Sequence, residues 1–104
     1  MNTDKRLNQL LEMLNEEPSD SFLRFAIALE YDKLNRPDEA LRYFQLIVTD
    51  DPDYVGVYLH LGNLYLQMNR PDEAVHTYRA GIERTKTKDP KTCNELMQAL
   101  QEIE

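Results

Sequence analysis

The sequence NRPDEA occupies residues 35–40 and recurs unchanged at residues 69–74. Six identical letters in a chain of 104 residues are very improbable by chance and indicate a duplicated structural unit. In the same register Pro18 aligns with Pro52 and Tyr31 with Tyr65. A period of about 34 residues with two helical segments per period predicts stacked helical hairpins.

Each residue type in this motif suits the turn between two helices. Proline fits the first position of a helix, where its missing N–H costs nothing. Asp38 and Glu39 would then lie in the first turn, where negative charge complements the helix dipole. Ala40 is small enough for close helix packing, and Arg36 must lie outside the helix because it precedes proline. The motif therefore predicts the end of one helix, a turn and the start of its antiparallel partner.

The segments on either side of the motif have different helical patterns. Residues 19–34 are apolar around most of the circumference of a helix, which is typical of a helix packed on several sides. Residues 40–48 carry a single apolar stripe, as in an ordinary amphipathic helix. We therefore predict an all-α fold, an α-α superhelical stack of antiparallel helical hairpins with about six helices.

The second period also carries a recognisable set of residues at fixed spacing. They are Tyr58, Leu61, Gly62, Tyr65, Ala74 and Tyr78. This pattern resembles the tetratricopeptide repeat family. The first period is similar at Ala28, Tyr31, Ala40 and Phe44, and it departs from the family pattern at Arg24, where a large apolar residue is preferred.

The proline positions suggest how the ends of the chain relate to the repeats. We expect one domain over residues 1–104, with an N-terminal half-repeat helix at 4–16 and a first repeat at 17–50. A second repeat would cover 51–88, and a C-terminal capping helix 89–103. We match Pro90 to Pro52. Because the separation of these two prolines exceeds one period, an insertion of about one helical turn is expected before the last helix.

The charge and composition disfavour several classes of partner. The net charge of −7 repels phosphate groups, so nucleic acid and anionic membranes are poor candidates. No apolar run approaches the length of a membrane span, and the N-terminal residues lack the pattern of a secretory signal. Cys93 is the single cysteine and has no intramolecular partner for a disulfide. We expect a cytoplasmic protein.

Residues with catalytic or metal-binding chemistry do not form a recognisable site. His60 and His76 lie on different predicted helices, and no His or Cys pair has the spacing of metal ligands. The acidic group Asp50, Asp51 and Asp53 lacks the other features of a calcium loop, and a helix cap is the better interpretation of Asp51. We therefore predict neither an enzyme nor a cofactor.

A short basic run near the end of the second repeat has two interpretations. It comprises Arg84, Lys86, Lys88 and Lys91. These cations could belong to a solvated helix end, where they complement the dipole. They could also form a docking patch for an acidic partner.

The family resemblance implies a binding surface on the first helix of each repeat, which in such stacks lines a concave groove for a partner peptide or helix. The residues expected there are Phe22, Phe25, Leu29, Asp32 and Lys33, then Leu59, Asn63, Leu66 and Gln67. Some members hold a carboxylate with a Lys/Asn/Arg clamp; here Asn63 matches, but Phe25 and Leu29 replace its Lys and Asn. A protein or peptide partner is expected. A terminal helix or a second copy of the chain could instead cover the apolar strip.

Overall fold

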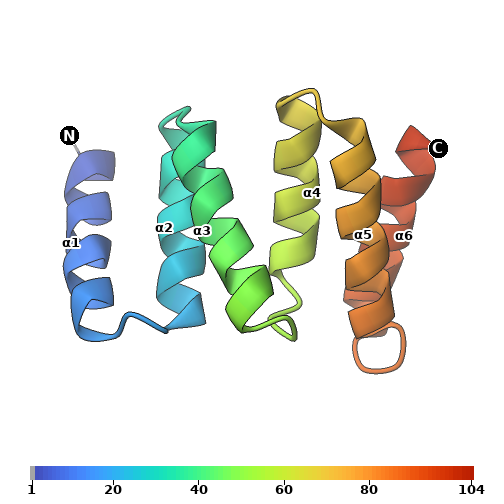
Figure 1. Cartoon of the computed structure of the whole chain (residues 1–104), viewed down its shortest axis with the longest axis horizontal. Coiled ribbons are helices and arrows are strands. Elements are labelled where there is room, and N and C mark those ends of the chain that lie inside the picture. Colours follow the sequence, from blue (N-terminus) through green and yellow to red (C-terminus); the bar gives the residue numbers. More distant parts are fainter. Residues whose placement is uncertain (1) are drawn as a thin grey trace. The chain divides into compact units, whose positions relative to one another are not determined.

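The computed structural model describes residues 2–104, with side chains from residue 5 onward. Over this range it contains six α-helices and no strand (Figure 1). The helices are α1 (Asn2–Glu16), α2 (Ser21–Lys33), α3 (Pro37–Asp50), α4 (Val57–Gln67), α5 (Pro71–Thr85) and α6 (Pro90–Ile103). They confirm the all-α prediction. The chain divides into two compact units, Met1–Asp51 and Pro52–Glu104, and the single domain predicted for residues 1–104 stays a prediction.

The asparagine of the repeated motif ends the first helix of each hairpin. Asn35 and Asn69 have φ values of 59° and 60°, the left-handed conformation that closes many helices. In the first copy the N–H of Asn35 donates to the carbonyl of Asp32, and the N–H of Arg36 donates to the carbonyl of Tyr31. The same two hydrogen bonds recur one period later. Together they satisfy carbonyl groups that the end of a helix leaves without partners.

The arginine of the motif connects the helix that ends to the helix that begins. The guanidinium carbon of Arg36 lies 5.1 Å from the ring centroid of Tyr31, and its Nε lies 3.0 Å from Oε2 of Glu39. Arg70 makes the same two kinds of contact, with Tyr65 and Glu73. As predicted, both arginines lie outside the helices, and Pro37 and Pro71 are the first helical residues.

Small residues allow the two helices of each hairpin to approach closely. Ala40 and Ala74 are completely buried. In the hairpin of α4 and α5, Gly62 lies against the ring of Tyr78: a methyl group on Gly62 would be 2.6 Å from the Cδ1 atom of Tyr78. A larger residue at position 62 would therefore require the ring to move.

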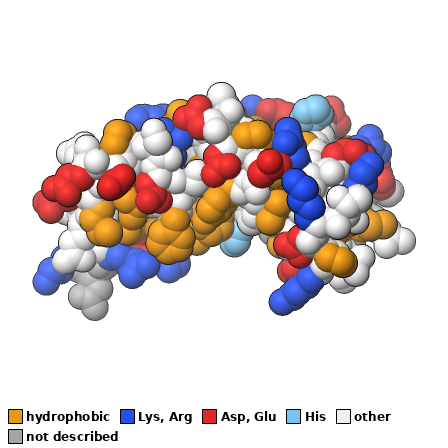
Figure 2. All heavy atoms as spheres, turned by 90° about the horizontal axis from the view of Figure 1, so that it is seen from below, with side chains coloured by type: hydrophobic (Ala, Val, Ile, Leu, Met, Phe, Trp, Pro, Cys, Tyr) orange, Lys and Arg blue, Asp and Glu red, His pale blue; other side chains and the backbone are white. Residues whose placement is uncertain are grey.

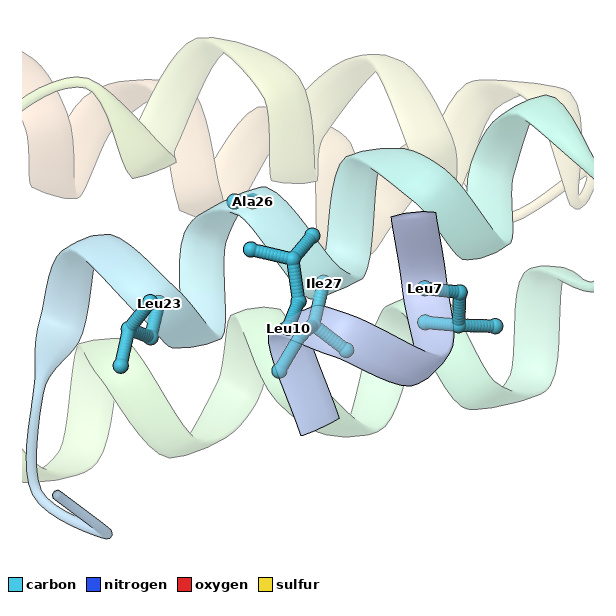
Figure 3. Close-up of a cluster of buried hydrophobic side chains, with 5 residues drawn as sticks. All are labelled: Leu7, Leu10, Leu23, Ala26 and Ile27. Carbon is cyan, nitrogen blue, oxygen red and sulfur yellow. The ribbon is translucent and has the colours of Figure 1, made fainter. Parts of the chain in front are cut away.

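The N-terminal unit is joined by an apolar cluster between α1 and α2 (Figure 3). It contains Leu7, Leu10, Leu23, Ala26 and Ile27. A polar contact accompanies this cluster, because Nε of Arg6 donates to Oε1 of Glu30 at 2.9 Å. The Glu30 side chain is 4% exposed, whereas that of Arg6 is 64% exposed. The leucine stripe of α1 comprises Leu7, Leu10, Leu11 and Leu14 and is visible in the sequence, whereas the ion pair was not predicted.

The start of α6 corrects the predicted one-turn extension. From the start of α3 to that of α4 the chain advances from residue 37 to 57, and from α5 to α6 it advances from 71 to 90. The second interval is the shorter of the two, so it contains no additional turn. Matching Pro90 to Pro52 was wrong because Pro90 is the first residue of a helix, whereas Pro52 lies in the turn before α4. None of the helices described here is both long and apolar enough to span a membrane.

Candidate functional site

The first helix of the N-terminal unit presents apolar side chains on one face. Phe22, Phe25 and Leu29 follow one another at intervals of three and four positions, which places them on the same side of α2. Phe22 is 65% exposed, whereas Phe25 and Leu29 are half-buried. The ring of Phe25 lies 6.0 Å from the ring of Phe44, centroid to centroid. Phe25 therefore also contributes to the hairpin of α2 and α3, and Phe22 is the most accessible of the three residues.

The polar residues predicted at the end of α2 are already part of local interactions. Nζ of Lys33 lies 3.6 Å from Oε1 of the buried Glu30. The backbone carbonyl of Asp32 accepts a hydrogen bond from Asn35 in the helix cap, and its side chain is half-buried. Lys33 itself is largely exposed, with 69% of its side chain accessible. It can therefore contribute charge at one edge of the α2 face.

The first helix of the C-terminal unit combines apolar and amide side chains. Leu59 and Leu66 are half-buried on α4, and Asn63 and Gln67 are exposed. The hydroxyl group of Tyr78 donates a hydrogen bond to Oδ1 of Asn63. Burial raises the pKa of Tyr78, and the charge of Glu102 adds to this effect, so the hydroxyl stays protonated and remains a donor. The amide oxygen of Asn63 is therefore held within the hairpin.

A shallow pocket of about 430 Å³ opens beside Phe22 in the N-terminal unit. It is lined by Met13, Glu16, Glu17, Asp20, Phe22 and Leu23. Figure 2 shows hydrophobic side chains at the surface of this unit with acidic side chains beside them. Met13 is 52% exposed, although the sequence analysis did not select it. The available signal was an apolar residue outside the leucine stripe of α1.

A second pocket of about 440 Å³ lies in the C-terminal unit and is lined by Ile82, Met97, Leu100, Gln101 and Glu104. Met97 is 52% exposed. The carboxylate of Glu104 is paired with Arg79. Met97 is therefore the most exposed apolar residue of this surface.

A model of the tetratricopeptide repeat family matches residues 33–101, which is more than half of the chain. The chain belongs to the tetratricopeptide repeat family. No match was found among curated proteins.

Two solved structures of a tetratricopeptide repeat domain protein from Salinibacter ruber are similar in both sequence and fold. The solution structure has 42% identity and a TM-score of 0.80, covering 84% of this chain and 89% of the other. The crystal structure has 41% identity and a TM-score of 0.77, covering 81% and 94%. The TPR2B domain of yeast Sti1, in a complex with pHsp70, matches at 17% identity with a TM-score of 0.89, over 98% of this chain and 82% of that domain. At 17% identity, the similarity to the Sti1 domain shows a shared fold and nothing more.

The residues considered for catalysis or metal binding lie on different elements of this tetratricopeptide repeat chain. His60 is exposed on α4 and His76 on α5. Cys93 is buried, with its Sγ atom 3.8 Å from Sδ of Met97. Asp51 is a helix cap residue, at the C-terminal end of α3, and its side chain accepts a hydrogen bond from the Ser21 hydroxyl at 2.6 Å.

Two residues of the basic run have acidic neighbours in the C-terminal unit. Arg84 lies 3.0 Å from Asp53, and Lys86 lies 2.8 Å from Glu83. The hydrogen bond from Lys86 to Glu83 raises the pKa of this lysine. In the described part of the chain, Lys88 and Lys91 form no ion pair and remain exposed.

Proposed function

We propose that this chain is a protein-binding module that holds a peptide or helix of a partner against the first helices of its repeats. Tetratricopeptide repeats are interaction modules, and the family is a non-catalytic scaffold. The observation that carries the proposal is Phe22, an aromatic side chain that is 65% exposed on the predicted binding face of α2. Exposed apolar surface of this kind commonly marks a binding site.

The chemistry of the two helix faces favours an amphipathic partner. Phe22, Phe25 and Leu29 would contact its apolar side, as would Leu59 and Leu66. Lys33, Asp32, Asn63 and Gln67 would form the polar edge. An amphipathic helix or an apolar peptide in a groove is recognised in this manner. In the proposed complex the apolar contacts supply affinity and the edge residues select orientation.

A carboxylate clamp is not part of this proposal. Phe25 and Leu29 stand where the clamp requires Lys and Asn, so the donors that would bind a carboxylate from α2 are missing. The yeast Sti1 domain shares the fold at 17% identity, and its complex with pHsp70 concerns that protein. We infer that apolar contacts, rather than a terminal carboxylate, select the partner of this chain.

The proposed partner is a cytoplasmic protein. Nucleic acid and anionic membranes are disfavoured, because the net charge of −7 repels their phosphate groups. A second candidate is a symmetric dimer in which another copy covers the Phe22 face. The exposure of Phe22 favours both arrangements equally, since either would remove it from water.

The test uses Phe22→Ser and Leu59→Ser, with His76→Ser on α5 as the matched control. Wild type and variants are immobilised, and a random-peptide display library is selected on each. The proposal predicts apolar or amphipathic peptides that bind wild type and the control but bind both groove variants at least about tenfold more weakly. Peptides that bind all four proteins equally would contradict it. A wild type that dimerises and loses the dimer in Phe22→Ser would favour the second candidate.

A further inference from the structure

The two terminal helices correspond to opposite halves of one repeat. Asp20 caps the start of α2 by accepting the N–H of Leu23, and Asp89 caps α6 by accepting the N–H of Thr92. Position 88 lies two periods after Asp20. The matching cap residue, Asp89, is therefore only one position away from the place that the repeat period predicts. The helix α6 is therefore the first helix of a repeat, and α1, two periods before α5, is a second helix.

The packing of α6 supports this alignment. With Asp89 superposed on Asp20, Leu96 takes the position of Ile27, and both side chains are completely buried. Ile27 packs in the cluster that joins α2 to the preceding α1. Leu96 similarly lies against the preceding α5, where a methyl group on Gly81 would be 2.8 Å from its Cδ1 atom.

Met97 then takes the position at which a first helix contacts its own second helix. The same superposition of the two caps matches Met97 to Ala28, which is completely buried. One period after Ala28, Gly62 lies directly against Tyr78 of α5. Met97 is instead 52% exposed, because no second helix follows α6 within the described residues.

Met13 takes a position on a second helix that faces the first helix of the same repeat. One period later the matching residue is Ile47, which is completely buried, and two periods later it is Gly81. A methyl group on Gly81 would lie 2.6 Å from Cβ of Tyr58, on the first helix of the same repeat. Met13 is 52% exposed, and α1 has no first helix of its own within the described residues. Each half repeat thus exposes one methionine where a whole repeat buries its hairpin contact.

The charges at the two half repeats are complementary. The acidic Glu12, Glu16 and Glu17 are exposed near the end of α1 and form no ion pair among the described residues. Lys88 and Lys91 are exposed at the start of α6 and are similarly unpaired there. An antiparallel arrangement, as in the hairpin of α4 and α5, would bring these two ends together.

We propose that α1 of one copy packs antiparallel against α6 of a second copy, so that two half repeats complete one tetratricopeptide repeat. Met13 and Met97 are the apolar contacts, and the acidic end of α1 faces the basic start of α6. The contact joins two different surfaces, so each copy keeps one free α1 or one free α6 for further copies. On α1 this contact adjoins Phe22, which lines the same pocket as Met13, whereas Leu59 lies on α4 and belongs to neither half repeat.

The test uses sedimentation velocity on the full chain from about 10 µM to about 1 mM, a range suited to a small interface. Wild type is expected to associate more as concentration rises, and less as added salt screens the charges. Met13→Lys and Met97→Lys should each weaken self-association at least about tenfold, because a charge would be buried in the contact. Circular dichroism should show unchanged helicity, since both residues are 52% exposed.

The decisive sample is an equimolar mixture of the two variants. Met13→Lys keeps an intact α6 and Met97→Lys keeps an intact α1, so together they should form a one-to-one complex with the wild-type affinity. Leu59→Ser should leave self-association unchanged, which separates this contact from the α4 part of the proposed peptide-binding face. A wild type that stays monomeric over the whole range, or a mixture that associates no better than the separate variants, would overturn the proposal.

Discussion

Substituting Gly62 by alanine tests whether the close approach of α4 and α5 limits the stability of the C-terminal unit. Helix propensity alone predicts a gain, because alanine in a helix interior is favoured over glycine by about 0.8–1.0 kcal/mol. The new methyl group, however, would lie 2.6 Å from Cδ1 and 2.8 Å from Cζ of Tyr78. Tyr78 is 1% exposed and has little room to move.

The cost of that contact exceeds the gain. Overpacking in a core costs about 1–3 kcal/mol, and moving the Tyr78 ring would weaken its hydrogen bond to Asn63, worth about 1 kcal/mol. Gly62→Ala should therefore lower the free energy of unfolding by about 1–2 kcal/mol after the propensity gain is subtracted. The assay is urea denaturation followed by far-ultraviolet circular dichroism, which reports helix content.

Gly56→Ala is the matched control for this substitution. No atom lies within 4 Å of a methyl group placed on Gly56, and its φ of −64° suits any residue. The control should be neutral or raise the free energy of unfolding by up to about 1 kcal/mol. If Gly62→Ala proved as stable as Gly56→Ala, the helices would separate without cost and the packing argument would be refuted.

Three further predictions concern the contacts that end or join helices. Arg6→Ala should destabilise the N-terminal unit by about 1–3 kcal/mol, because it removes the closer cation beside the buried Glu30. In thermal unfolding, the double variant with Glu30→Gln should recover part of the lost stability. Asn69→Ala should cost about 1 kcal/mol in denaturation because of its φ of 60°, whereas Asn69→Gly should not. Hydrogen bonds from Thr92 lower the pKa of Asp89, so this cap stabilises α6 above the ordinary carboxyl pKa and is lost as pH falls; Asp89→Asn should flatten the acid side of the stability profile.

The hairpin turn was the part of the fold that the sequence predicted most fully. Pro37 and Ala40 have roles that follow from their chemistry wherever they occur, so their positions could be assigned from the motif alone. Asn35 was not assigned in advance, although asparagine is one of the few residues that favour the left-handed cap. Its place directly before Arg-Pro was the signal for that conformation.

The spacing before α6 could not be predicted from proline alone. Proline suits both a turn and the first position of a helix, so Pro90 and Pro52 have the same letter in different structural positions. Asp89 and Thr92 are a better guide to the start of α6 than Pro90. Asp is a preferred N-terminal cap residue, and the Asp89 side chain accepts hydrogen bonds from the N–H and the hydroxyl of Thr92, three positions later. Using that cap would have predicted a chain without the extra turn.

The sequence predicted which side of a helix each candidate residue occupies, but not how exposed its side chain is. The helical period placed Phe22 and Phe25 on one side of α2, yet only the packing against Phe44 distinguishes their exposure. The hydrogen bond of Asn63 to Tyr78 depends on two helices meeting, which no single helical pattern contains. Met13 was missed for a related reason, because it lies beside the leucine stripe and is exposed where the described helices leave its hairpin position open.

The proposed function requires that the exposed face of the first helices binds a partner protein. It is tested most directly by tagged capture from cells, comparing wild type, Phe22→Ser and His76→Ser in the same experiment with quantitative mass spectrometry. Phe22 is 65% exposed, so its loss should leave the thermal unfolding temperature unchanged. We expect a protein that is captured by wild type and by His76→Ser but is depleted with Phe22→Ser. Equal recovery of every captured protein with all three chains, each folded, would contradict the claim.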